Sequence, residues 1–352
     1  MRFIFDARLP RVRFGDGELA RLPDEVSALG AKRVLVLCTP QQLEHAQRVS
    51  TLLGQQAVAT FDQAVMHVPT ETVADAIAVA EQVDADLAVA IGGGSTIGLA
   101  KALALKRNLP FIAIPTTYAG SEMTPIYGLT EQGRKLTGRD PKVLARSVIY
   151  DPELSRELPI GLTVTSGLNA IAHAVEGMYA TDGNPVISLM AEEGIRAMAV
   201  AIAGLVTAPS DPVFRSQALQ GAWLCGTVLG NSGMGLHHKL CHTLGGSFNL
   251  PHAEVHSVIL PHALAYNEPM VPDIAARIAA ALGGAGTASS QLFALAKKAG
   301  APLSLREIGM READLDQATS LVFEQRYPNP RPLEELAIRK LLQRAFDGSP
   351  PL

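Results

Sequence analysis

Short runs of hydrophobic residues alternate with helix-like patterns in the first part of the chain. Four apolar runs predict strands, and the segments between them space their apolar residues as an amphipathic helix does. This alternation is typical of parallel βαβ units. The expected strands cover residues 34–38, 85–91, 111–116 and 147–151, and the expected helices cover residues 41–54, 70–83 and 96–107.

The pattern changes after residue 154, near the segment DPELSRELP with its two prolines. Beyond it, long segments with helical periodicity follow one another, separated by Gly, Pro and Asp. The sequence therefore predicts an α/β plus all-α protein, with a Rossmann-like parallel-sheet domain over residues 1–154 and an all-helical domain over 155–352. The expected helices of the second domain cover 163–180, 186–206, 212–230, 235–245, 252–266, 271–283, 288–299, 311–325 and 333–347.

Length, charge and cysteine usage narrow the class of protein. A chain of 352 residues exceeds what one hydrophobic core usually supports, and its net charge of −4 does not suit binding to nucleic acid. The start MRFIFDARLPRVRF lacks the features of a signal peptide, and the apolar run 197–208 is shorter than the roughly 20 residues that span a bilayer. We expect a cytoplasmic protein that binds neither nucleic acid nor membrane, with three buried thiols at Cys38, Cys225 and Cys241.

A glycine-rich loop, AIGGGSTIGLAKAL, lies between an expected strand and an expected helix. Glycines let the backbone approach a phosphate, and a helix N-terminus offers unpaired N–H groups to it. Gly92, Gly93, Gly94 and Ser95 are therefore a candidate phosphate cradle, although an isolated GGGS is about as often a tight turn. A second such loop, IPTTYAGSEMT, favours a dinucleotide lying across both loops. The first expected strand ends in Cys38 and Thr39 without an acid, so we expect both NADH and NADPH to bind.

Five of the nine histidines lie within LHHKLCHTLGGSFNLPHAEVH. Residues four apart share a helix face, so Asn169 with His173, and His238 with His242, form two pairs. Four buried imidazoles, counting His252, need many polar partners unless they line a polar site. Such histidines can ligate a divalent metal, but the amide of Asn169 stands where a carboxylate usually completes the shell. We therefore predict no metal; if one is bound, its ligands are His173, His238 and His252.

The remaining histidines have less specific interpretations. We expect His256 and His262 to be core residues and His237 to face solvent, whereas His45 and His67 have no assigned role. Cys241 lies inside the histidine-rich segment and could be near the chemistry. Runs of cations are mostly solvated, but one such run is the obvious source of anion binding in an acidic chain. Its members are Arg134, Lys135, Arg139, Lys142 and Arg146.

In this order, and over nearly the full length, these motifs resemble the iron-containing alcohol dehydrogenase family. The resemblance implies an N-terminal dinucleotide-binding domain, a C-terminal helical domain and homodimers. It places the family's metal-ligand positions at Asn169, His173, His238 and His252, and a further active-site histidine at His242. It also implies cofactor contacts at Gly92, Gly93, Gly94, Ser95, Thr116, Thr117 and Lys135. We add Thr39, at the end of the first expected strand, to these cofactor positions.

Two departures from the family pattern point to one branch of it. The family has an Asp at the position of Gly98 in GGGSTIGLAKA and a metal-binding Asp at the position of Asn169. Both departures, with IPTTYAGSEMTPIYG and GRKLTGRDPKVLARSVIYDPELS, are similar to the maleylacetate reductase branch. That resemblance implies reduction of the double bond of 2-maleylacetate, a dicarboxylate, to 3-oxoadipate in bacterial degradation of aromatic compounds.

The expected mechanism uses histidines without a metal. Hydride addition leaves an enolate, whose oxygen imidazoles can stabilise, and His242 is the first candidate for proton delivery. Asn169 would orient the substrate and avoid the repulsion that an Asp would exert on a dianion. Two alternatives stay open: a metal-dependent alcohol or polyol dehydrogenase, and a non-catalytic nucleotide-binding protein built on the same fold.

Overall fold

The computed structural model describes residues 3–131, 134–324 and 327–352, without the side chains of residues 134 and 135. The chain divides into two units, one comprising residues 7–158 and the other residues 159–352 together with the N-terminal residues up to Asp6. The sequence placed the limit at residue 154 and assigned the N-terminal residues to the first domain. We refer to the two units as the sheet unit and the helical unit.

Six parallel strands form the centre of the sheet unit, in the order β1-β8-β5-β4-β2-β3. The four predicted strands are confirmed and lie side by side in the middle, where neither face meets water. This explains their continuous apolar runs. The two edge strands were not predicted, because the RVRF of one carries two arginines and the AVATF of the other is only partly buried. The strands are β1 (Arg11–Phe14), β2 (Val34–Leu37), β3 (Ala57–Phe61), β4 (Leu87–Gly92), β5 (Phe111–Pro115) and β8 (Ser147–Tyr150).

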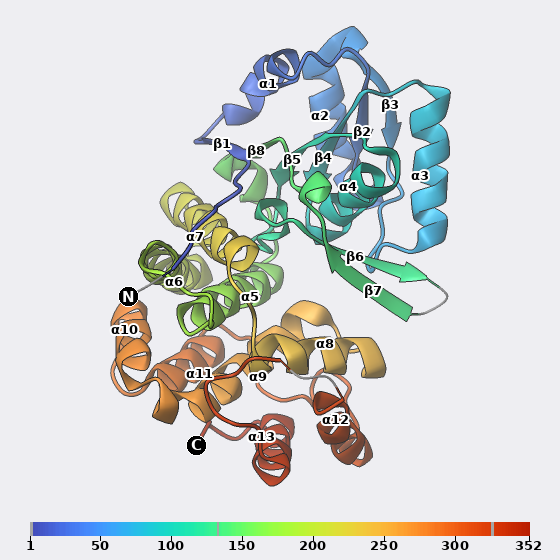
Figure 1. The fold of residues 1–352 in the computed structure, drawn as a ribbon. Coiled ribbons are helices and arrows are strands. Elements are labelled where there is room, and N and C mark those ends of the chain that lie inside the picture. The colour runs from blue at the N-terminus through green and yellow to red at the C-terminus, as the bar shows by residue number, and fades with distance from the viewer. Residues whose placement is uncertain (1–2, 132–133, 325–326) are drawn as a thin grey trace. The chain divides into compact units, whose positions relative to one another are not determined.

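Helices cover both faces of this sheet (Figure 1). The chain runs from β2 through α2 (Leu43–Leu53) to β3 at the edge, and then through α3 (Thr70–Gln82) back to β4 on the other side of β2. It continues through α4 (Gly94–Arg107) to β5. Right-handed crossovers therefore place α2, with α1 (Leu22–Ala28), on one face and α3 with α4 on the other. The direction of winding changes between β2 and β4, which is where such sheets bind ligands.

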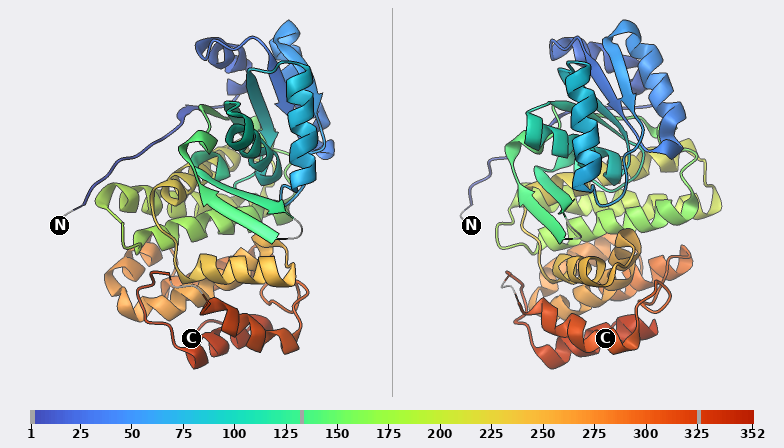
Figure 2. Two further views of the ribbon diagram at one scale, coloured as in Figure 1. Left: turned by 45° about the vertical axis from the view of Figure 1, so that its right-hand side comes forward. Right: turned by 90° about the vertical axis from the view of Figure 1, so that its right-hand side faces the viewer.

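An antiparallel hairpin that the sequence did not predict follows β5. It pairs β6 (Ile126–Glu131) with β7 (Arg134–Arg139), and Figure 2 shows it apart from the parallel sheet. The predicted cofactor residue Lys135 lies on β7, but its side chain, like that of Arg134, is outside the described part of the chain. The other predicted cations, Arg139, Lys142 and Arg146, are exposed.

The helical unit contains the nine predicted helices, each within a few residues of its expected limits apart from α12. That helix is shorter than the predicted 311–325, because a 3-10 turn, Glu312–Asp314, precedes it. Asn184 and Asp211 accept N–H bonds from the first turns of α6 and α7 and so define where these helices begin. The helices are α5 (Ile160–Met178), α6 (Pro185–Thr207), α7 (Pro212–Asn231), α8 (Leu236–Phe248), α9 (His252–Asn267), α10 (Pro272–Leu282), α11 (Ala288–Lys298), α12 (Leu315–Val322) and α13 (Glu335–Asp347).

Helix α5 is the central helix of this unit. It is buried from Thr163 to Met178 and packs against α6, α7 and α9, and an apolar surface on all sides is typical of such a core helix. Gly177 permits the close approach of α7, because a Cβ there would overlap Val228. Polar side chains on α5 are therefore held in fixed positions.

None of the helices in the described part of the chain has the length and the apolar character that a membrane-spanning helix needs.

Candidate active site

Apart from Lys135 on β7, the predicted cofactor residues of the sheet unit lie at the carboxyl ends of β2, β4 and β5. Gln42, in the 3-10 turn after β2, joins them, because its Nε2 donates to Thr116 Oγ1 at 2.5 Å and its Oε1 accepts from Thr39 Oγ1 at 3.4 Å. The backbone N–H of Thr116 donates to the carbonyl of Gly92 at 3.1 Å. Three strand ends are thus fixed relative to one another. Sequence reasoning missed Gln42, whose only signal was its position directly after the strand.

The loop after β4 has the space and the donors that a pyrophosphate needs. Gly92 has a φ of 154°, and a Cβ there would overlap Gln42 Oε1 and come within 2.5 Å of Thr96 Oγ1. The first N–H groups of α4, beginning at Gly94, have no carbonyl one turn earlier in the helix to bond. Thr96 Oγ1 is buried, and no described residue is its hydrogen-bond partner. These features fit a bound NADH or NADPH phosphate.

In the helical unit, α5 carries three polar side chains on one face. Asn169, His173 and Glu176 are spaced as i, i+4 and i+7, and all three are almost completely buried. The amide oxygen of Asn169 is buried and has no hydrogen-bond partner in the described part of the chain. This arrangement places the predicted pair Asn169 and His173 on one face and adds Glu176, which sequence reasoning missed.

A chain of short contacts joins α5 to α8. His173 Nδ1 lies 2.8 Å from His238 Nε2, and His238 Nδ1 lies 2.7 Å from Glu176 Oε2. The two imidazoles are tilted by 31° with their centroids 4.9 Å apart. Two of the four predicted histidines are therefore in direct contact, and the carboxylate of Glu176 ends the chain.

Glu176 also caps α8. Its Oε1 accepts the backbone N–H of His237 at 2.7 Å, and its Oε2 accepts those of Gly235 at 2.9 Å and His238 at 3.3 Å. An anion at a helix N-terminus satisfies donors that the helix cannot pair and interacts favourably with the helix dipole. The same side chain therefore determines where α8 begins and where its first histidines lie.

A second layer of histidines lies behind the first and corrects one prediction. His237, expected to face solvent, is fully buried, and its Nε2 lies 3.0 Å from His256 Nδ1 and 3.6 Å from Cys241 Sγ. Burial, followed by the neighbouring histidines, lowers the pKa values of His237 and His256 well below the usual range, so both rings are neutral at neutral pH. Burial raises the pKa of the Cys241 thiol well above its usual range.

The other histidines occupy different surroundings. His252 begins α9, is half-buried, and has its ring centroid 4.4 Å from that of His256. His242 is exposed on α8, with its centroid 6.1 Å from that of His238. His262 is a core residue, as predicted, with burial and then Arg344 lowering its pKa to about 4. His256 is buried too, but its ring contacts place it inside the histidine cluster.

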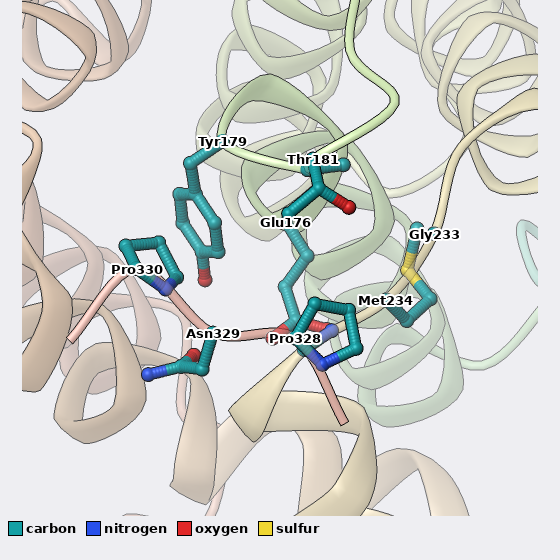
Figure 3. A pocket seen from close by; sticks show the side chains of 10 residues that line it. Glu176, Tyr179, Thr181, Gly233, Met234, Pro328, Asn329 and Pro330 are labelled. Atoms are coloured by element: carbon teal, nitrogen blue, oxygen red, sulfur yellow. The ribbon is translucent and has the colours of Figure 1, made fainter. Parts of the chain in front are cut away.

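A small cavity adjoins Glu176 (Figure 3). It has room for roughly a single water, about 20 Å³, and Tyr179, Met234 and Asn329 are among its lining residues. Burial, followed by the charge of Glu176, raises the pKa of Tyr179 well above its usual range, which keeps the phenol protonated. The carboxylate of Glu176 is thus surrounded by protein, with almost no solvent.

The residues at the metal positions implied by the resemblance do not fit a divalent metal. Asn169 offers a neutral amide, and the facing nitrogens of His173 and His238 bond to each other. Among the described residues, the three ligand atoms found within 4.8 Å of one another belong to His237, Cys241 and His256, not to the predicted set. In that second group the facing ring nitrogens of His237 and His256 bond to each other at 3.0 Å.

Two family models match the chain. The model for iron-containing alcohol dehydrogenase covers residues 10–152, and the model for the C-terminal region of the Fe-containing alcohol dehydrogenase family covers residues 163–346.

Individual relatives cover the chain over its whole length. The maleylacetate reductase of Pseudomonas sp. (strain P51) is 59% identical over 351 residues, covering 100% of this chain and 99% of the relative. The maleylacetate reductase of Burkholderia cepacia is 59% identical over 349 residues, covering 99% of each. The crystal structure of maleylacetate reductase from Agrobacterium tumefaciens has 50% identity and a TM-score of 0.96, with 100% of both chains covered.

Proposed function

This chain belongs to the iron-containing alcohol dehydrogenase family, and from that premise we propose that it reduces the carbon–carbon double bond of 2-maleylacetate to 3-oxoadipate with NADH or NADPH. The observation that carries the proposal is the contact between His173 and His238, beside an amide at position 169. A family member with these residues has the hydrogen-bonding groups of an active site where a metal would otherwise be held. The full-length relatives at 59% identity are maleylacetate reductases.

The substrate class follows from the charge of the site. Maleylacetate carries two carboxylates, and an aspartate in place of Asn169 would repel them in a buried position. The neutral amide can instead donate to a carboxylate or a ketone. Its oxygen, which has no hydrogen-bond partner among the residues that the structure describes, remains able to accept from the substrate side or from water.

The reaction adds a hydride to the alkene carbon remote from the ketone and a proton to the alkene carbon next to it. Bound NADH or NADPH supplies the hydride. The residues around Gly92 hold its pyrophosphate, and the absence of an acid after β2 favours use of both cofactors. The electron pair displaced from the double bond collects on the ketone oxygen as an enolate.

The histidines stabilise that enolate and supply the proton. His173, held by His238, faces the charge that develops on the ketone oxygen. His242 is exposed on α8 and can exchange its proton with water, so it delivers the proton to carbon. His252 completes the polar wall at the start of α9. No step requires a metal.

The test is the initial rate of NADH oxidation with 2-maleylacetate, measured on protein dialysed against a strong chelator. Fast turnover supports metal-free reduction of the double bond. His173→Gln should lower kcat by about 100-fold or more, because about 100-fold is the lower end of the range for a general acid–base group. His45→Gln, in the sheet unit, is the matched control and should leave the rate unchanged.

Two other outcomes contradict the proposal. Turnover that appears only after adding Zn²⁺ or Fe²⁺, with an alcohol as the better substrate, identifies a metal-dependent alcohol or polyol dehydrogenase. Cofactor binding without turnover of either substrate identifies a nucleotide-binding protein.

The setting that we propose is the bacterial cytoplasm, in the degradation of aromatic compounds, with the protein as a homodimer. The three cysteines are free and buried, as suits a reducing compartment. Light scattering in solution tests the oligomeric state.

A further inference from the structure

The mechanism proposed above gives Glu176 no role, yet its carboxylate ends the chain of contacts from His173. Its side chain is completely buried and touches His238 Nδ1 at 2.7 Å. We infer that Glu176 is a positioning residue, which fixes the ring nitrogen of His238 that carries the proton and, through His238, the corresponding proton of His173. The inference rests on the proposed function, because it names what orders the histidine wall of that site.

The contacts of Glu176 determine the direction of its bond to His238. Three backbone N–H groups, of Gly235, His237 and His238, donate to the carboxylate oxygens. An ionised carboxylate only accepts hydrogen bonds, whereas a protonated one needs an acceptor, and these three partners are all donors. Oε2, the oxygen that meets His238 Nδ1, already accepts the N–H groups of Gly235 and His238 at a helix N-terminus, which favours the ionised carboxylate. His238 Nδ1 is then the donor and carries a proton.

The position of the proton on His238 also determines the position of the proton on His173. A neutral imidazole has one donor nitrogen and one acceptor nitrogen, so His238 Nε2 accepts when Nδ1 donates. The partner of that acceptor is His173 Nδ1, 2.8 Å away, which must then hold a proton. In this tautomer the second nitrogen of His173, Nε2, carries no proton.

This order has a consequence for the chemistry. The ring pair presents a single arrangement of donor and acceptor nitrogens to the site, because its far end contacts a buried carboxylate with room beside it for roughly one water. Histidines held in one arrangement need no reorganisation when the charge of the enolate develops.

The primary test is the tautomeric state of the two rings in the resting wild-type protein. Nuclear magnetic resonance of protein labelled with ¹⁵N in its histidine rings distinguishes a proton on Nδ1 from one on Nε2. Loss of signals in His173→Gln and His238→Gln assigns the two rings. We expect both rings to carry a proton on Nδ1, and finding His238 with its only proton on Nε2 overturns the inference.

The second test is Glu176→Gln, whose amide keeps an acceptor for the cap of α8 but can turn either its oxygen or its NH₂ group toward His238. We expect a mixture of tautomers at His238 and a kcat about 10- to 100-fold lower, the range typical of losing a residue that orients a catalytic histidine. The KM for maleylacetate should change by no more than about threefold, because Glu176 does not touch the substrate. Glu193→Gln, on α6 beside Arg196, is the matched control.

A purely structural role predicts a different result. If Glu176 only caps α8, Glu176→Gln lowers the melting temperature while the tautomers and kcat stay as in the wild type, and the inference is wrong. If the variant does not fold, Glu176→Asp keeps the charge and the cap but shortens the reach to His238, and a partial loss of kcat is expected. Absence of turnover in the wild type refutes the proposed function alone, because the tautomers are measured without substrate.

Discussion

Placing a side chain at position 98 should destabilise the sheet unit, although the family has an Asp there. A Cβ on Gly98, in α4, would lie 2.7 Å from Val68 Cγ2. Val68 cannot easily move away, because it is buried and its carbonyl accepts the N–H of Thr130 at 3.1 Å. Its φ is 49°, a left-handed conformation that is unusual for a β-branched residue. Gly98→Ala therefore forces an added methyl group into occupied space.

The size of the effect follows from the overlap. Extra carbon atoms in a well-packed core typically cost about 1–3 kcal/mol. For a unit of this size that corresponds to a fall of roughly 2–12 °C in melting temperature, taking about 2–4 °C per kcal/mol. Gly94→Ala, in the first turn of the same helix, meets no atom within 4 Å and should leave the melting temperature unchanged or raise it.

A double-mutant cycle tests whether Val68 is the cause. Val68→Ala removes the methyl group that Gly98→Ala meets, so the double variant should be at least about 1 kcal/mol more stable than the two single effects predict. The free energy of unfolding is measured by urea titration of all four proteins, with the dissociation constant of NADH as a second measurement. Additive effects, within about 0.5 kcal/mol, or a Gly98→Ala protein as stable as the wild type, would refute the reasoning.

Three further predictions concern the rest of the molecule. Asn169→Asp restores the family's metal-binding pair with His173, so the amount of metal retained after dialysis should rise. The kcat/KM with maleylacetate should fall by about tenfold or more, because the new carboxylate repels the dianion. Unchanged metal content with full activity contradicts this prediction. His262 has a folded-state pKa of about 4, below the usual 6.5, so its contribution to stability is fully present above pH 6.5 and is lost as the pH falls toward 4. In urea titrations, the free energy of unfolding should therefore fall between pH 8 and pH 5 by roughly 2 kcal/mol less in His262→Leu than in the wild type. His67→Asn, at an exposed site, is the control. Gly92→Ala should raise the dissociation constant of NADH by roughly tenfold in a fluorescence titration, because the new methyl group overlaps Gln42 and requires a φ that alanine rarely adopts.

The sequence predicted elements well where burial is uniform. The strands β2 and β5 are apolar throughout because helices cover both faces of the sheet. The edge strand β1 and the hairpin β6–β7 have charged or exposed positions, so their sequences lack that signal. Helices in the second unit were recognisable from apolar residues at helical spacing, and several, such as α6, α7 and α9, begin beside a Pro, Asp or Asn.

The site was predictable only where residues lie close in sequence. Helical spacing was enough to find Asn169 and His173, and it was available for Glu176, but an acid on a helix more often faces solvent. Only the packing of α5 against the start of α8 shows that Glu176 is buried and caps that helix. The same contact explains why the prediction of a solvent-facing His237 was wrong. His237 lies in the first turn of α8, which Glu176 caps, and its ring is buried against His256.

The burial of all three thiols makes the protein convenient for site-specific labelling. Cys38, Cys225 and Cys241 are inaccessible, and burial raises the pKa of each, to about 11 for Cys38, so almost no reactive thiolate forms at neutral pH. A cysteine introduced at an exposed position, such as Leu336 in α13, would then react alone with a maleimide dye. Pairing it with a second such site in the sheet unit would let fluorescence energy transfer follow the two units during turnover, with the native cysteines left in place.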